Sequence, residues 1–246
     1  MMQRLALMLT VLVLSWAANP SRAQVSVDIE LVIAIDTSVS VSDQEFALQL
    51  LGVADAMRGP LVQEAITSMP DGLAVTVMEW SYGHLNRPVL PWFHLRTAND
   101  SFAFANHVEQ VQRNGGGRAT AIGEAITRAT ELLNNNNFAG LFRKIDISGD
   151  ARNNSGVNPL VPRQIAIDQG ITINGLAILT SDRELGTYYS TFVAGGAGSF
   201  VMAISSSGSI RNAMRRKLER ELQFQLSHTN PDPFVQKARM SFDEDQ

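Results

Sequence analysis

The chain of 246 residues contains no cysteine. This absence excludes a disulfide framework, a thiolate metal site and a cysteine nucleophile. Charged residues make up only 18% of the chain, which argues against both a disordered protein and a charged coiled coil. The net charge is −4, so the composition does not indicate a nucleic-acid-binding surface. With 45% hydrophobic residues, a chain of this length can fold around a core without cross-links.

Two common kinds of site are also missing. The four histidines show no ligand spacing such as His-x-x-x-His; they are His84, His94, His107 and His228. The glycine run at residues 115–117 is not followed by Lys and Ser or Thr and does not directly follow a strand, so it does not match a phosphate-binding loop. We therefore interpret the glycine run as a flexible loop.

Long apolar runs are scarce, and the one at residues 5–18 follows the positive charge of Arg4. It is shorter than the ~20 residues of a membrane-spanning helix, and Ser21-Arg22-Ala23 places small residues where a signal peptidase reads. Residues 1–23 are therefore predicted to be a cleavable signal peptide, with a retained N-terminal anchor as the alternative. The mature protein is expected to be periplasmic or secreted, without a membrane span after cleavage.

Strand-like and helix-like segments alternate along the mature chain. Buried strands are predicted at residues 27–35, 73–80, 144–148, 171–179 and 199–204. Residues 87–94 contain two prolines and can form at most an edge strand. Helices are predicted between the strands, at residues 43–57, 102–111, 121–133, 159–169, 188–193 and 210–222.

This order predicts an α/β fold with a doubly wound, mostly parallel six-stranded sheet, one antiparallel edge strand and helices on both faces. One domain is expected over residues 24–226, followed by a polar C-terminal tail at 227–246. The last helix carries the basic residues Arg215, Arg216, Lys217 and Arg220. Because the net charge is negative, we expect them to form a solvated helix face and not a polyanion site.

Polar side chains gather where ligands bind in such a sheet, at the carboxyl ends of the strands. Asp36 ends the first predicted strand and is followed closely by Ser38 and Ser40. Asp150 follows the strand at 144–148, which should neighbour the first strand, and Thr120 stands where a loop enters a helix.

These five side chains offer two carboxylates and three hydroxyls. Such hard oxygen ligands suit a divalent cation such as Mg²⁺, Mn²⁺ or Ca²⁺ better than zinc. A carboxylate from a protein partner is a natural further ligand. No general base or nucleophile accompanies the set, so we predict binding and no enzymatic activity.

The pattern Asp36-x-Ser38-x-Ser40 after an apolar strand, then Thr120 and then Asp150, resembles the von Willebrand factor A-type domain, in which it is called the metal-ion-dependent adhesion site. Residues 120–126 look like the family's threonine loop and residues 147–150 like its fourth strand and acidic loop. The resemblance covers residues 27–222 and is closest to an uncharacterised group of exported bacterial proteins. It implies a Mg²⁺-dependent module for protein binding or adhesion.

By resemblance, the two serines coordinate the cation directly, while the threonine and the aspartates bind it directly or through water. Two residues depart from the family pattern. Ala151 stands where glycine usually follows the aspartate, and Gly149 stands where threonine or serine commonly precedes it. Both departures bear on the position of the Asp150 loop.

Other interpretations remain open at this stage. Asp36, Ser38 and Ser40 are also typical turn residues, Thr120 is a typical helix cap, and Asp150 on its own is an ordinary loop residue. A metal-assisted hydrolase of phosphate esters is an alternative function, but phosphotransferases of the haloacid dehalogenase type need an acid at the position of Ser38. A cation-independent envelope scaffold is the third possibility.

Overall fold

The structure is a computed structural model that describes residues 24–229. The predicted signal peptide, residues 1–23, lies outside the described residues, and so does the predicted tail beyond residue 229.

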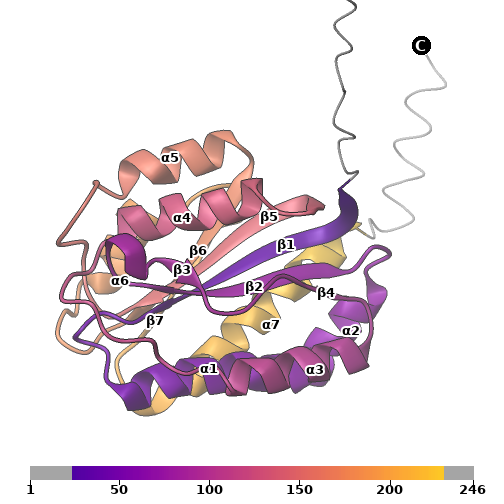
Figure 1. Ribbon diagram of the computed structural model, residues 1–246, viewed down its shortest axis with the longest axis horizontal. Coiled ribbons are helices and arrows are strands. Elements are labelled where there is room, and N and C mark those ends of the chain that lie inside the picture. The colour runs from indigo at the N-terminus through magenta and orange to yellow at the C-terminus, as the bar shows by residue number, and fades with distance from the viewer. Residues whose placement is uncertain (1–23, 230–246) are drawn as a thin grey trace, which may run out of the picture.

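One twisted sheet of seven strands runs through the molecule (Figure 1). Its five parallel strands are β1 (Val25–Asp36), β2 (Leu73–Trp80), β5 (Phe138–Gly149), β6 (Ile171–Ile178) and β7 (Val201–Ile204). Along the sheet the order is β3-β2-β1-β5-β6-β7, so the chain leaves β1 toward β2 on one side and later returns to its other side with β5. The point where the strand order reverses is the usual ligand position in such folds.

The predicted α/β fold, with its mostly parallel sheet and antiparallel edge, is confirmed. The edge differs in detail, because two short strands replace the single predicted one. They are β3 (Arg87–Pro88) and β4 (Phe93–Leu95), and both pair antiparallel with β2. Pro91 lies between them, and a proline has no N–H to continue the ladder.

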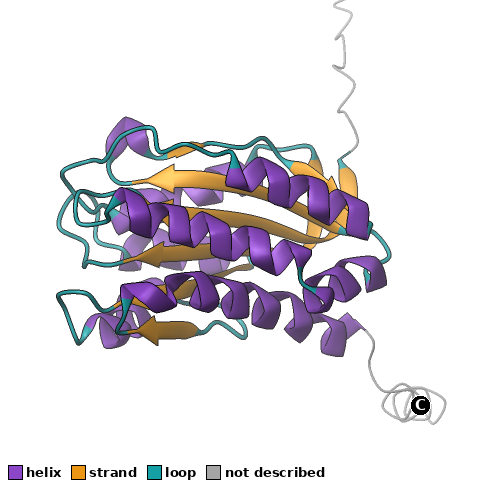
Figure 2. Cartoon of the chain, turned by 90° about the horizontal axis from the view of Figure 1, so that it is seen from below, coloured by secondary structure: helices purple, strands orange, loops and turns teal. Residues whose placement is uncertain are grey.

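Helices cover both faces of the sheet. On one face lie α1 (Asp43–Arg58), α2 (Pro60–Ser68), α3 (Ala98–Glu109) and α7 (Ile210–Thr229), and Figure 2 shows this layer in front of the strands. On the other lie α4 (Ile122–Asn134), α5 (Leu160–Asp168), α6 (Leu185–Tyr188) and a π-helical turn at Tyr189–Val193. Short 3-10 turns occupy Gly83–Leu85 and Ser207–Ser209.

The alternation of β1 explains the two layers of core. Leu31 and Ile33 point to the α1 and α7 face, and Val32 and Ala34 point to the α4 face. All four are fully buried, as expected for a strand covered on both sides. The β1 strand therefore reaches the carboxyl edge of the sheet through the centre of the protein.

The helix that follows β1 starts at a defined residue. Ser42 caps α1 by accepting a hydrogen bond from the Glu45 N–H, and the Glu45 carboxylate accepts one from the Ser42 N–H in return. This capping box fixes the end of the short loop that leaves Asp36. The prediction that α1 ends at Gly59 is also correct, but a further helix, α2, begins directly at Pro60.

The basic cluster on α7 forms the predicted solvated face except at Lys217. Lys217 is fully buried, and its ammonium pairs with the carboxylate of Asp146 on β5. Arg216 and Arg220 are exposed. The helix thus directs one charge of the cluster into the core, where it pairs with a carboxylate.

Within residues 24–229, none of the helices has both the length and the hydropathy needed to cross a membrane.

Candidate metal centre

Asp36 is the last residue of β1, between β2 and β5 at the carboxyl edge of the sheet. Its register partner on β2 is Trp80, and on β5 the preceding Ile35 pairs with Ser148. The side chain of Asp36 is fully buried. A carboxylate is therefore held at the point where the strand order reverses.

Several hydrogen bonds hold the loop that follows Asp36. The Ser38 N–H donates to Oδ1 of Asp36 at 2.7 Å. The backbone N–H and the hydroxyl of Thr37 both donate to the carbonyl of Trp80, at 2.9 and 3.1 Å. The hydroxyl oxygens of Ser38 and Ser40 lie 3.2 Å apart. The two serines therefore point into one small space beside Asp36.

Asp150 closes this space from the other strand. It follows the last residue of β5, and its Oδ1 accepts a hydrogen bond of 2.6 Å from the Ser40 hydroxyl. Asp150 is buried, while Ser40 is exposed. Four of the five predicted site residues, Asp36, Ser38, Ser40 and Asp150, are thus linked in one chain of polar contacts.

Thr120 is held by a different set of contacts. Its N–H donates to Oδ1 of Asn154 at 2.8 Å, and the Asn154 N–H donates back to its carbonyl at 2.9 Å. This pair ties the start of α4 to the loop that carries Asp150. Thr120 is buried but does not cap the helix: the cap position is Ala121, and the Asn153 side chain accepts from the Gly123 N–H.

Burial dominates the electrostatics of the site. It raises the pKa of Asp36 from 3.8 to about 7, and hydrogen bonds from Ser38 only partly oppose this. Burial likewise raises the pKa of Asp150, against the effect of the Ser40 hydrogen bond. Among the described residues, Oδ2 of Asp36 has no hydrogen-bond partner. A buried carboxylate oxygen without a partner is costly, and a bound cation would compensate for it.

The donor set fits a hard divalent cation. Within residues 24–229, no group of three or more His, Cys, Asp and Glu side chains is placed to hold a metal ion. A cation at this position must therefore take several ligands from hydroxyls and water. Two carboxylates, two serine hydroxyls and a threonine match the preferences of Mg²⁺ or Mn²⁺.

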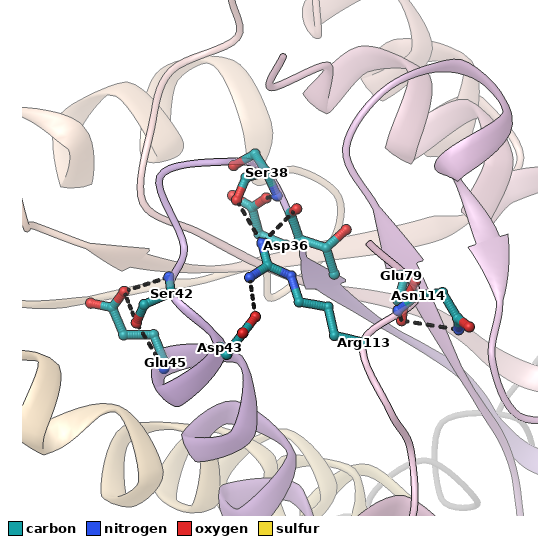
Figure 3. Close-up of polar contacts among 9 residues, drawn as sticks. Asp36, Ser38, Ser42, Asp43, Glu45, Glu79, Arg113 and Asn114 are labelled. Carbon is teal, nitrogen blue, oxygen red and sulfur yellow. Dashed lines mark hydrogen bonds and ion pairs between the residues drawn. The ribbon is translucent and has the colours of Figure 1, made fainter. Parts of the chain in front are cut away.

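Arg113 supports the loop from outside, and no sequence pattern indicated it. One guanidinium nitrogen, Nη2, donates to the carbonyls of Thr37 and Ser38 at 3.0 and 3.1 Å, while Nη1 donates to Asp43 at 2.7 Å (Figure 3). Arg113 therefore joins the site loop to the first turn of α1. An isolated arginine next to a glycine run carries no distinctive spacing, so only the structure shows this role.

The glycine run lies against the same loop. The Val39 N–H donates to the carbonyl of Gly117 at 2.8 Å, and a side chain at Gly117 would overlap the hydroxyl of Ser81. Val39 itself stands between the two serines and is 72% exposed. A groove of about 830 Å³ begins here, between α1 and residues 109–116. The site loop therefore presents an apolar side chain and an open groove next to its hydroxyls.

With this geometry in view, comparison with known proteins gives the family. The sequence family described as "Protein of unknown function (DUF1194)" matches residues 26–226. The chain belongs to this family. No curated protein matches the sequence.

Solved structures confirm the von Willebrand factor A-type fold of this DUF1194 member. One is proximal thread matrix protein 1 from the mussel byssus, with 16% identity and a TM-score of 0.58 over 79% of this chain and 48% of that one. A von Willebrand factor type A protein from Catenulispora acidiphila has 18% identity and a TM-score of 0.56, over 80% and 43%. The pilus adhesin SpaC from Lactobacillus rhamnosus GG has 12% identity and a TM-score of 0.57, over 79% and 30%.

The DUF1194 chain therefore corresponds to less than half the length of each of these three proteins. The mussel protein has also been solved with a zinc-occupied metal-ion-dependent adhesion site motif. Identities this low establish only a shared fold. They do not show that this chain binds the ligands of these proteins.

Proposed function

We propose that this domain binds one divalent cation, Mg²⁺ or Mn²⁺, at Asp36, Ser38, Ser40, Thr120 and Asp150, and uses the cation to bind a carboxylate of a protein partner. The main support is the buried Oδ2 of Asp36, which has no hydrogen-bond partner among residues 24–229 and lies at the end of a chain of hydroxyls. Two carboxylates balance the charge of the ion. When one of the protein ligands binds the ion through a water molecule, the ion can still attract an anion from outside the domain.

The surroundings of the site favour recognition of a protein. Ser40 and Val39 are exposed at the carboxyl edge of the sheet, so a partner can reach the ion and contact an apolar side chain at the same time. The relatives include a pilus adhesin and a structure with zinc at the equivalent kind of motif, which supports a binding role. We further propose that residues 1–23 direct export and that the domain acts in the periplasm or after secretion.

Capture with and without a chelator tests this function. Purified wild-type domain and its Asp36→Asn variant are each immobilised and exposed to envelope extract in Mg²⁺ or in EDTA. We expect a protein that is retained only by the wild type and only with Mg²⁺. Equal retention in EDTA would instead indicate a cation-independent scaffold, and turnover of generic phosphate esters that is lost in Asp36→Asn would indicate the hydrolase.

A further inference from the structure

Tyr189 has a buried hydroxyl next to the candidate metal centre. The residue opens the π-helical turn after α6 and is fully buried among Trp80, Leu185 and Val193. Its hydroxyl has no hydrogen-bond partner among the described residues. Burying a hydroxyl without a partner costs free energy, so this position calls for an explanation.

Gly149 shows how close the Tyr189 hydroxyl lies to Asp36. A Cβ atom built on Gly149 would stand 2.4 Å from the Tyr189 oxygen and 2.9 Å from Oδ2 of Asp36. Both unpartnered oxygens therefore lie within 3 Å of one point. A phenol can donate one hydrogen bond and an ionised carboxylate can only accept, so the two groups are complementary.

Glycines on two neighbouring strands leave the space that the Tyr189 side chain occupies. Any side chain at Gly149 on β5 would overlap the hydroxyl, and a Cβ at Gly175 on β6 would come within 2.9 Å of the Tyr189 ring. Gly149 has no positive φ, so its backbone does not require glycine. The absence of a side chain at Gly149 therefore serves the close approach of Tyr189 and Asp36.

We propose that Tyr189 is a positioning residue for the cation site, which donates a hydrogen bond through one bridging water molecule to Oδ2 of Asp36. This inference rests on the proposed function. Oδ1 of Asp36 already accepts from the Ser38 N–H, so a donor on Oδ2 fixes the plane of the carboxylate. Each carboxylate oxygen has two lone pairs, so Oδ2 can accept this hydrogen bond and still bind the cation. Residues that orient a ligand in this way are typically worth 10–100-fold in metal affinity.

Burial raises the pKa of Tyr189 well above its usual value, and the charges of Asp36 and Asp150 act in the same direction. The phenol therefore keeps its proton and remains a donor throughout the neutral range.

Titration calorimetry with Mn²⁺ on the wild type, Tyr189→Phe and Tyr82→Phe tests the proposal. Tyr82 is an exposed tyrosine, so the control loses the same atom without losing a buried donor. We expect Tyr189→Phe to weaken Mn²⁺ binding by about 10-fold or more and Tyr82→Phe to leave it unchanged. Unchanged affinity in Tyr189→Phe, with or without a loss of thermal stability, would overturn the inference.

A second measurement needs no metal. In EDTA, urea unfolding of Tyr189→Phe, Asp36→Asn and the double variant should give non-additive changes in stability, because the two side chains interact. Additive changes would refute the proposed interaction. If the wild type bound no Mn²⁺, the proposed function and this inference would fall together, whereas equal binding by wild type and Tyr189→Phe would remove the inference alone.

Gly149→Ala checks the geometry itself. Introduced into the wild type, Gly149→Ala should lower the melting temperature. Introduced into Tyr189→Phe, it should lower the melting temperature less, because the oxygen that the new methyl group would overlap is absent. Equal losses in both backgrounds would show that the hydroxyl does not lie above Gly149.

Discussion

The hydroxyl of Ser40 donates a 2.6 Å hydrogen bond to Oδ1 of Asp150, joining two loops that are 110 residues apart in the sequence. The loops leave neighbouring parallel strands, β1 and β5, at the same edge of the sheet. The contact therefore connects the two halves of the candidate site. Ser40 is exposed, whereas the other four predicted site residues are buried.

Replacing Ser40 should separate metal binding from folding. Ser40→Ala removes one proposed ligand and the hydrogen bond to the buried Asp150, so we expect Mg²⁺ affinity to fall by at least about 10-fold and the stability in EDTA to fall by only about 1–3 kcal/mol. Ser206→Ala, an exposed serine beyond β7, is the matched control. Mg²⁺ titration calorimetry and urea denaturation measure the two quantities, and unchanged affinity would exclude Ser40 as a ligand.

The stability of the metal-free protein should depend on pH through Asp36. The folded-state pKa is about 7 against the ordinary 3.8, so the folded chain keeps a proton that the unfolded chain loses between these values. Stability is therefore lost as the pH rises through this range. Asp36→Asn cannot ionise, so its free energy of unfolding should rise relative to that of the wild type from about pH 4 to about pH 7, in urea denaturation with EDTA. A difference that does not change with pH would contradict this.

Added Mg²⁺ should reverse the loss of stability that the metal-free protein shows as the pH rises. The ion binds the ionised carboxylate, so its stabilising effect on the wild type should grow with pH and be absent in Asp36→Asn. Thermal denaturation at several pH values, with Mg²⁺ and with EDTA, measures this effect.

The buried pair of Lys217 and Asp146 should matter for stability and not for metal binding. Both side chains are buried between α7 and β5. Lys217→Met leaves the Asp146 carboxylate without its cation, and we expect a loss of about 3–5 kcal/mol in the free energy of unfolding. Adding Asp146→Leu should recover only part of this loss, because the buried carboxylate of Glu221, 3.8 Å from the Lys217 ammonium in the wild type, also loses its cation. A loss below about 1 kcal/mol in urea denaturation would argue against the pair.

Arg113 should act on the site through the backbone of its loop. Arg113→Ala removes two hydrogen bonds to the carbonyls of Thr37 and Ser38 and one to Asp43, so Mg²⁺ affinity should fall although Arg113 touches no proposed ligand side chain. The expected loss is about 10-fold. Arg118→Ala, in the same loop but exposed, should bind like the wild type. Equal affinities for the two variants would rule out this role.

The sequence predicts the fold well where segments have a strong pattern. The strand at residues 73–80 is found with the same bounds, because both of its faces are buried and its sequence is almost continuously apolar. The strand predicted at 144–148 begins earlier, at Phe138, since its first half alternates in exposure beside the start of β1. The helix α2 was missed because Gly59-Pro60 looks like a stop, yet Gly59 ends one helix and precedes the next.

The site was predictable only in part. Asp36, Ser38, Ser40 and Asp150 could be placed together because parallel strands bring their carboxyl ends to one edge. The sequence does not separate Lys217 from the solvated members of its cluster, because a run of basic residues does not reveal which of them has a buried partner. Tyr189 and Arg113 are single residues far from the motif in sequence, and their relation to Asp36 depends on how loops pack.

Calorimetric titration of Mg²⁺ and Mn²⁺ into the purified domain, with Asp36→Asn beside it, tests the central claim most directly. Asp36→Asn keeps the shape of the side chain and removes the charge that a cation needs. We predict one bound ion per wild-type chain and none in Asp36→Asn, with both proteins folded by circular dichroism. No uptake by the wild type, or equal uptake by both proteins, would contradict a cation site at Asp36.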